Sequence, residues 1–221
     1  MAAFDLDFTL HQGEFTLAFS VKVEARALAL FGASGSGKTS ALEAVAGLRT
    51  PRRGTIAVNG RVLFDSDRHL NTSVRSRRTG YVPQDILLFP HLNVRENVVY
   101  GLREGNRPDL RVLVELLELS PLMDRRVGSL SGGERQRVAM ARALYSGPDV
   151  LLFDEPLAAV DLPRRRRIVD ALLGIRDELS VPLIYVTHLP EEALTVADWA
   201  LLIDNGRIAA SGPPRDVMPS D

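Results

Sequence analysis

The chain has 221 residues, a formal net charge of −1 at pH 7 and no cysteine. Hydrophobic residues make up 45% and charged residues 25%, which is typical of a globular domain with a buried core. The missing cysteines exclude disulfides, zinc–thiolate sites and thiol catalysis, and the small net charge predicts no general attraction to nucleic acid or anionic lipid. The N-terminus, MAAFDLDF, does not resemble a signal peptide, and no apolar run reaches membrane-spanning length, so we expect a cytosolic protein.

The N-terminal third predicts strands around one strand–loop–helix unit. Residues 4–10 and 14–21 alternate apolar and polar side chains, as strands of a half-exposed sheet do. A short apolar strand, a glycine-rich turn and a helix that ends at Gly47 follow, and a hairpin that turns at Asn59–Gly60 completes this part. These later elements are expected at residues 26–31, 32–39, 40–48 and 55–64.

The rest of the chain combines a helical segment, at about residues 93–145, with alternating strands and helices. Short, fully apolar strands indicate a parallel sheet, and a second Asn-Gly hairpin lies near the C-terminus. We therefore predict an α/β fold with a doubly wound, mostly parallel sheet, N-terminal antiparallel strands and an inserted α-helical subdomain. The helices are expected at 109–119, 131–144, 164–179 and 191–197, and the strands at 149–153, 182–188 and 199–211, with Ile168, Ala171, Leu172, Ile175 and Leu179 on one apolar helix face.

The segment GASGSGKT fits the pattern G-x-x-x-x-G-K-[ST], with the required strand before it and helix after it. The glycines let backbone N–H groups point inward at an anion, and the helix N-terminus adds a partial positive charge. Lys38 would neutralise the β- and γ-phosphates, and Thr39 would offer a hydroxyl to Mg²⁺. The alternative, a flexible Gly/Ser linker, does not explain this placement. The predicted nucleotide-binding residues are Gly32, Ala33, Ser34, Gly35, Ser36, Gly37, Lys38, Thr39 and Ser40.

Two acids, Asp154 and Glu155, end the apolar strand of VLLFDEP. Ligands of open α/β sheets lie at the carboxyl ends of strands. We expect Asp154 to reach Mg²⁺ directly or through water. Glu155 would point to the other side of the strand and take a proton from the attacking water. The alternative is a polar strand end with two solvated acids.

The stretch LSGGERQ, at residues 130–136, precedes a helical run. Ser131 and Glu134 have the spacing of a capping box. Gly132 and Gly133 each cost about 1 kcal/mol of helix propensity relative to alanine, and they leave the first N–H groups open to an anion. A helix that needs only a cap has little reason to carry both glycines.

Six motifs occur in order along nearly the whole chain: GASGSGKT, YVPQD, LSGGERQ, VLLFDE, LAAVD and VTH. Together they resemble the ATP-binding cassette (ABC) ATPases. The resemblance implies one domain over 1–221, with a RecA-like P-loop NTPase core of about 1–84 and 147–221 and a helical subdomain of about 85–146. It also implies ATP hydrolysis, with ATP and Mg²⁺ as cofactors.

The resemblance implies roles for three further residues. Gln84 would contact Mg²⁺ and the attacking water, His188 would hold the γ-phosphate, and Asp161 would lie at a subunit interface. Simpler interpretations exist for each: a polar loop residue, a histidine at a strand end, and the N-cap of the helix that contains Pro163. Asp161 is compatible with both roles.

A homodimer is also implied. Because the chain cradles its own phosphates at residues 32–39, the anion that faces Ser131 and Gly133 would belong to the ATP of a second subunit. Two chains would sandwich two ATP molecules, closing on binding and reopening after hydrolysis. The residues expected to bind ATP in trans are Ser131, Gly132, Gly133 and Glu134.

The sequence departs from the family pattern at two places. Ala158 stands where the family often has a serine, so one hydroxyl contact across the interface is missing. The family usually stacks adenine on an aromatic residue well before the phosphate loop, and no Tyr or Trp stands there. Phe8, His11 and Phe15 are the candidates for this contact.

Three stretches resemble the ATPase subunits of molybdate importers within the family: NGRVLFDS, GYVPQDILLFPHLNVRENVVYGL and FDEPLAAVDLPRRR. Other importers share much of them, so sulfate, polyamine and iron remain alternative solutes. The molybdate subunits often carry a C-terminal oxyanion-binding regulatory domain. Because the sequence stops at Asp221, either this member lacks that domain or the chain was truncated, so the sequence does not support feedback control by the bound oxyanion.

An importer subunit implies partners. Integral membrane permease subunits would dock near Gln84 and the apolar segment 87–92, whose alternative role is internal packing, and a periplasmic or surface solute-binding protein would take part indirectly. The expected location is cytoplasmic, peripheral on the inner face of the cell membrane.

Non-transport functions fit the motifs less well. A soluble ABC ATPase of DNA repair or translation is the main alternative. Only 92 residues separate Lys38 from Ser131, with no heptad run, which disfavours the coiled-coil repair type, and translation types generally carry two cassettes. The arginine runs 75–78 and 164–167 suggest a nucleic-acid patch, but the second opens an amphipathic helix as a solvated face, so no nucleic-acid partner is expected.

Overall fold

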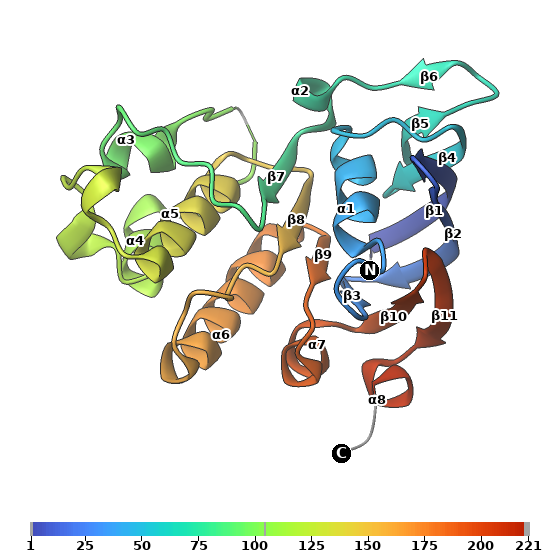
Figure 1. The fold of residues 1–221 in the computed structure, drawn as a ribbon. Helices are drawn as coiled ribbons and strands as arrows, with labels where there is room; N and C mark the ends of the chain where they lie inside the picture. The colour runs from blue at the N-terminus through green and yellow to red at the C-terminus, as the bar shows by residue number, and fades with distance from the viewer. Residues whose placement is uncertain (1, 104, 219–221) are drawn as a thin grey trace. The chain divides into compact units, whose positions relative to one another are not determined.

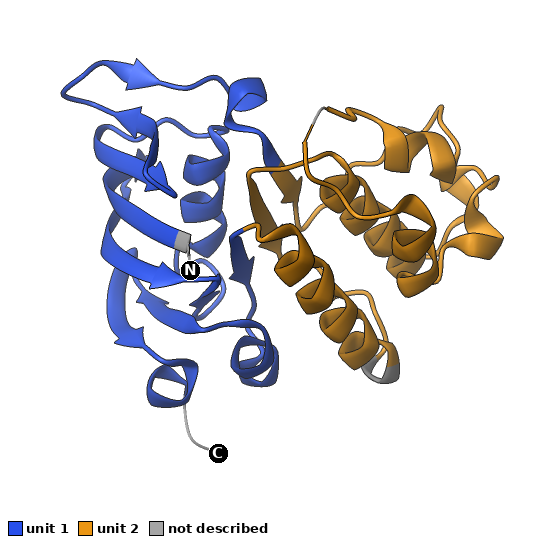
Figure 2. Ribbon diagram, turned by 180° about the vertical axis from the view of Figure 1, so that it is seen from behind, with its two compact units in different colours: residues 1–79, 182–221 blue, residues 80–181 orange. Residues whose placement is uncertain are grey.

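The computed structural model describes residues 2–103 and 105–218. The chain divides into two compact units, Met1–Thr79 with Pro182–Asp221 (unit 1) and Gly80–Val181 (unit 2) (Figure 2). The expected helical subdomain, 85–146, lies within unit 2, which also contains the strand and the long helix that follow it. The organisation as one domain with a subdomain of those bounds stays a prediction.

Unit 1 contains a mixed sheet with the strand order β6-β5-β4-β1-β2-β11-β10-β3-β9 (Figure 1). Neighbours from β6 to β2 pair antiparallel, as do β10 and β11. The pairs β2–β11, β10–β3 and β3–β9 are parallel. The strands are β1 (Ala2–Gln12), β2 (Phe15–Ala25), β3 (Ala27–Phe31), β4 (Arg53–Val58), β5 (Arg61–Asp65), β6 (Leu70–Asn71), β9 (Leu183–Val186), β10 (Trp199–Asp204) and β11 (Arg207–Gly212).

Both predicted Asn-Gly hairpins are present in unit 1. Asn59 and Gly60 have φ of 52° and 73°, and Asn205 and Gly206 have φ of 45° and 77°. Two consecutive positive φ values match the twist of the flanking strands in a two-residue turn, and Asn-Gly adopts them most readily. The strands joined are β4 with β5 and β10 with β11.

The helices of unit 1 are α1 (Lys38–Ala46), α2 (Val74–Arg77), α7 (Pro190–Val196) and α8 (Pro214–Val217). Helix α1 contacts β2 and β9 and ends, as predicted, at Gly47, whose φ is 84°. Arg77 is 1% exposed and donates to the carbonyls of Ala44 and Val45 at 2.7 and 2.8 Å, so it satisfies the last turn of α1. The basic run 75–78 gave no sign of this buried role.

Unit 2 contains β8 (Val150–Asp154), most of β7 (Thr79–Val82) and the helices α3 (Val94–Val99), α4 (Leu110–Leu116), α5 (Gly132–Tyr145) and α6 (Leu162–Leu179), with 3₁₀ turns at Ser120–Leu122 and Val127–Ser129. Helices α3 and α4 pack on α5. The predicted apolar face of α6 is buried, from Ile168 to Leu179. The helix expected over 109–119 ends early, because Glu118 has a left-handed φ of 52°. No helix in the described part of the chain is long and apolar enough to cross a membrane.

Candidate nucleotide-binding and signature sites

The loop between β3 and α1 can be built only with glycine at two positions. Gly32 has φ of 148°, and a Cβ there would lie 2.2 Å from the Ile203 carbonyl oxygen. Gly37 has φ of 108°, and a Cβ there would lie 2.9 Å from a methyl of Leu17. The second hairpin supports the loop as well, since Gly206 N–H donates to the Ser36 carbonyl at 3.0 Å. The curled loop is therefore held from two sides by the sheet of unit 1.

Two polar side chains are buried inside this loop. Lys38 is 5% exposed and donates through Nζ to the carbonyls of Gly32 and Ala33, at 2.8 and 2.7 Å. The Ser36 hydroxyl is buried and has no hydrogen-bond partner among the described residues. A buried hydroxyl without a hydrogen bond destabilises the fold unless a bound ligand provides the missing partner. Residues 33–35, at the tip, are exposed. The loop thus presents an accessible opening with an ammonium and an unsatisfied hydroxyl behind it, which suits a phosphate.

Helix α1 begins without any of the usual caps. Its N-cap is Gly37, in the left-handed region, with no side-chain hydrogen bond, and its first turn carries no acid. Thr39 is half-buried in that first turn, and the Ser40 hydroxyl bonds the Gln12 side-chain amide at 2.9 Å. The partial positive charge of the helix N-terminus is therefore not offset by an acidic side chain of its own first turn.

The two predicted acids at the end of β8, Asp154 and Glu155, lie in different environments. Asp154 is 1% exposed, whereas Glu155 is half-buried and has φ of 45°. A non-glycine residue in this region costs about 1–3 kcal/mol and persists only where its surroundings hold it. The Glu155 carbonyl accepts from Ala158 N–H at 3.2 Å and from the Gln136 amide Nε2 at 3.3 Å. These bonds hold the backbone of Glu155 in its turn.

The start of α5 carries the predicted capping box. Ser131 Oγ accepts from Glu134 N–H at 3.3 Å, and the Glu134 carboxylate accepts from Ser131 N–H at 2.7 Å. The bond from the Ser131 backbone N–H is the main cause that lowers the pKa of Glu134, with Arg125 and Arg137 adding to it. Hydrogen bonds to the charged form favour ionisation.

The glycines at the start of α5 have a packing reason that the sequence did not reveal. A Cβ on Gly133 would lie 2.8 Å from the Ala159 carbonyl oxygen, and one on Gly132 would lie 3.3 Å from the Ala159 Cβ. The turn at residues 155–160 therefore passes directly against the first turn of α5. This contact explains Gly133 without any ligand, so the glycines alone no longer argue for an anion.

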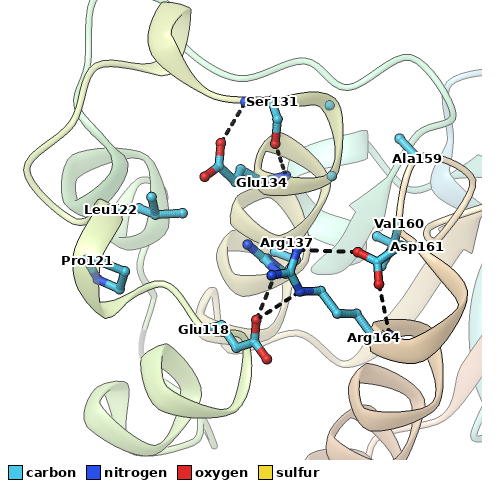
Figure 3. A pocket seen from close by; sticks show the side chains of 12 residues that line it. Glu118, Pro121, Leu122, Ser131, Glu134, Arg137, Ala159, Val160, Asp161 and Arg164 are labelled. Carbon is cyan, nitrogen blue, oxygen red and sulfur yellow. Dashed lines mark hydrogen bonds and ion pairs between the residues drawn. The ribbon is translucent and has the colours of Figure 1, made fainter.

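A cavity of 570 Å³ opens between the starts of α5 and α6 (Figure 3). Glu118 links the two helices through ion pairs. Its carboxylate lies 3.3 Å from Arg137 of α5, and 3.4 Å and 3.3 Å from Arg164 and Arg167 of α6. Arg164 also pairs with Asp161, which accepts from Arg164 N–H and is the predicted N-cap of α6. The lining residues are Glu118, Pro121, Leu122, Ser131, Gly132, Gly133, Glu134, Arg137, Ala159, Val160, Asp161 and Arg164.

The two remaining predicted residues are exposed and follow strands. Gln84 lies in the loop after β7, and His188 lies two residues after the end of β9. Thr187, just before the histidine, donates to Glu192 at 2.7 Å, and Tyr185 donates to the same carboxylate at 3.1 Å. Glu192 on α7 thus fixes the end of β9.

The predicted site residues fall into two groups. Unit 1 carries residues 32–40, His188 and the adenine-stacking candidates Phe8, His11 and Phe15, and unit 2 carries the others. Within unit 2 the structure brings Glu155, Asp161 and the start of α5 together through the turn 155–160. That the two groups meet around one nucleotide stays a prediction.

Sequence reasoning missed Gln136, Glu118 and Glu192 as supports of the site. For Gln136 a signal existed, since it lies three residues after Gly133 and so on the same helix face. No local pattern marked the other two.

A curled glycine loop between a buried strand and a helix, in an α/β fold with N-terminal antiparallel strands, defines a P-loop NTPase. The chain belongs to the ABC transporter family, which matches residues 6–158. Both the predicted fold class and the family resemblance are confirmed.

Two relatives with high sequence identity are both named as import proteins within this family. The chain is 43% identical over 217 residues to "Molybdenum import ATP-binding protein ModC" of Escherichia coli O6:H1, covering 98% of this chain and 62% of that protein. It is 46% identical over 218 residues to the protein of the same name from Paramagnetospirillum magneticum, covering 97% and 60%. The chain therefore spans about three fifths of the length of these relatives.

Solved structures show the same fold. A bacterial Atm1-family ABC exporter with ATP bound matches with a TM-score of 0.82 and 26% identity, over 98% of this chain and 39% of that chain. A dimeric, post-hydrolysis ATP-binding cassette bound to ADP and Pi matches with a TM-score of 0.78 and 26% identity, over 97% and 99%.

Proposed function

We propose that the protein is the ATP-hydrolysing, energy-coupling subunit of an ABC importer for molybdate or a related oxyanion. The observation that carries the nucleotide site is the loop 32–39, where Lys38 and the unsatisfied Ser36 hydroxyl lie buried behind an exposed tip. Family membership and the two molybdenum-import relatives support the transport role. Sulfate, polyamine or iron importers are the alternatives within this proposal.

The phosphate end of the site uses residues of unit 1. Lys38 would leave the carbonyls it now contacts and place its ammonium on the β- and γ-phosphates, and Ser36 would gain a phosphate oxygen as partner. Mg²⁺, when bound, offsets charge on the phosphate oxygens. Thr39, Asp154 and Gln84 offer a hydroxyl, a carboxylate and an amide oxygen, all hard oxygen donors that suit this ion.

The attacking water requires a base, and Glu155 is the candidate. Its backbone is fixed by two bonds to its carbonyl, while its side chain is only half-buried. In this mechanism the carboxylate takes the water proton, His188 holds the γ-phosphate in line, and Gln84 orients the water.

Glu155→Gln tests the base assignment. The amide cannot accept a proton, so we expect ATP turnover to fall by about a hundredfold or more, while ATP binding persists. Glu178→Gln makes the same change at an exposed position of α6 and serves as the control. Steady-state hydrolysis and nucleotide titration of both variants give the answer; near-normal hydrolysis by Glu155→Gln would remove the base.

Phe15 is the candidate for adenine stacking. Its ring lies 3.3 Å from the position of a Cβ on Gly37, directly beside the phosphate loop, and it is half-buried. Phe8 is 2% exposed and stacks on Phe19, so it is not accessible to a base. His11 bonds the Thr16 hydroxyl at 3.0 Å.

A homodimer would complete the site. In it, Ser131, Gly133 and the cavity of Figure 3 would face the nucleotide of the second chain, and Asp161 would lie at the interface as well as capping α6. The dimeric cassette with ADP and Pi supports this arrangement by analogy.

The docking surface for a permease would be the apolar patch formed by Leu87, Phe89 and Tyr100. Leu87 is 70% exposed and Tyr100 51%, and the centroids of the Phe89 and Tyr100 rings are 4.0 Å apart. Buried Asn97 holds the segment, since it accepts from Phe89 N–H and donates to its carbonyl. Such a patch on a rigid support suits an apolar helix of a membrane protein, which would place the chain on the inner face of the cell membrane.

Leu87→Glu tests this surface. A carboxylate there would oppose burial against an apolar helix, so we expect co-purification with a co-expressed permease to fall about tenfold. Because Leu87 is exposed, ATP binding should not change. Val112→Glu, on the exposed face of α4, is the matched control. Retention of the permease by Leu87→Glu would contradict the docking assignment.

A further inference from the structure

The side chain of Gln136 bridges the signature helix and the turn that carries Glu155. Gln136 lies in the second turn of α5 and is 3% exposed. Its Nε2 donates to the Glu155 carbonyl at 3.3 Å, and its Oε1 accepts from Ala159 N–H at 2.9 Å. One amide therefore satisfies both ends of the turn at once.

This turn is the place where a small displacement would matter. It starts at Glu155, whose left-handed φ of 45° depends on its surroundings, and it ends just before the N-cap Asp161. On its other side Gly133 passes so close to the Ala159 carbonyl that a Cβ would lie 2.8 Å away. A shift of the first two turns of α5 would therefore be passed directly to the backbone of Glu155.

We propose that Gln136 is a positioning residue that couples the start of α5 to Glu155, so that the geometry of the base follows engagement of Ser131 and Gly133. The inference rests on the proposed role of Glu155 as base. Gln136 touches no reacting atom. Its contribution is to hold the Glu155 backbone through a donor and an acceptor carried on one side chain.

Two variants separate the bonds from mere packing. Gln136→Leu fills similar space with neither donor nor acceptor. Gln136→Glu keeps the acceptor for Ala159 N–H, but when ionised it sets a carboxylate oxygen against the Glu155 carbonyl. When that carboxyl is protonated, its O–H donates to the carbonyl again. Burial favours the protonated form, so rescue falls within a usable pH range.

The first readout needs neither nucleotide nor activity. Hydrogen exchange of Ala159 N–H, followed by NMR on the full chain, should be about tenfold faster in Gln136→Leu and unchanged in Gln136→Glu. Equal protection in wild type and Gln136→Leu would overturn the bridge.

The second readout is turnover. A misplacement of about 1 Å can cost up to a hundredfold, so kcat for ATP should fall at least about tenfold in Gln136→Leu, with the KM within about twofold. The ratio of kcat in Gln136→Glu to that in wild type should rise as the pH falls from about 8 to about 6, while the ratio for Gln136→Leu stays flat. A flat ratio for both would overturn the proposal.

Ser146→Ala is the control, because it removes a hydrogen bond of 2.8 Å, to the Ala143 carbonyl, at the far end of the same helix. It should leave both readouts unchanged. Glu155→Gln separates the two hypotheses: if that variant is inactive and Gln136→Leu keeps wild-type kcat, only the positioning role fails. If Glu155→Gln is active, the base assignment itself fails.

Discussion

Two helices of this chain begin at glycine-rich stretches, and they solve the problem of the open N-terminus in opposite ways. Helix α1 starts at Gly37, with no side-chain cap and no acid in its first turn. Helix α5 starts at Ser131, with a complete capping box closed by Glu134. The first N-terminus carries no anion of its own and the second already holds one, so only the first is built to take a phosphate within the same chain.

The glycines differ in the same way. In the loop before α1, the left-handed backbone of Gly32 and Gly37 shapes the cradle itself. In α5, Gly133 lies in the helix and yields space to the Ala159 carbonyl. Similar composition thus serves ligand binding in one place and close packing in the other, and a substitution at each site can test its role.

The largest effect is expected at Lys38. Lys38→Ala removes the only cation buried in the loop, so we expect ATP affinity to fall by about a hundredfold, the equivalent of about 2.7 kcal/mol. Lys22, the other lysine of the chain, is exposed on β2 and pairs with Asp5, so Lys22→Ala is the matched control. Titration with a fluorescent ATP analogue would measure both. Unchanged binding by Lys38→Ala would remove the phosphate-loop assignment.

An intermediate effect is expected at Ser131. Ser131→Arg keeps the phosphate loop intact but places a long cation at the start of α5, where the second chain's nucleotide would bind, so ATP should still bind while the ATP-dependent dimer is lost. Size-exclusion chromatography of the chain with ATP, in a background that does not hydrolyse it, would show this. Ser73→Arg, at the exposed N-cap of α2, is the control. If Ser131→Arg dimerises and hydrolyses normally, Ser131 acts as a cap alone.

The sequence predicted the parts of this structure that local chemistry decides. The pairs Asn59–Gly60 and Asn205–Gly206 predict their turn type, because few other residue pairs accept two positive φ values. The spacing of Ser131 and Glu134 is enough to predict a capping box. The loop 32–39 is equally local, since its glycines and Lys38 act within one strand–turn–helix unit.

Contacts between distant segments could not be predicted in this way. Arg77 belongs to a run that suggests a nucleic-acid patch, yet it is buried and donates to the carbonyl of Val45, 32 residues earlier, at the end of α1. The helix predicted through residue 119 stops at Leu116, because Glu118 adopts a left-handed turn. Pairing of Glu118 with three arginines from α5 and α6 accompanies that turn. These are tertiary effects that override helical propensity.

The smallest effect is expected from the charge of Glu134. It tests whether the negative charge of this side chain adds to the stability of the capping box of α5. Because hydrogen bonding to Ser131 lowers the pKa of Glu134 below its ordinary value, the folded state favours the carboxylate. The resulting stability is present above the unfolded-state pKa and is lost as the pH falls through the folded-state pKa.

Glu134→Gln keeps a capping box whose side chain does not titrate. When the pH is lowered from neutral to below about pH 4, the free energy of unfolding of this variant should therefore decrease less than that of the wild-type protein. The difference should be about 1 kcal/mol, the usual worth of a cap, and urea unfolding at several pH values would measure it. Parallel pH curves for the two proteins would mean that the charge of Glu134 adds nothing to the cap. The N-terminus of α5 would then be closer to that of α1, open to an anion from outside the chain.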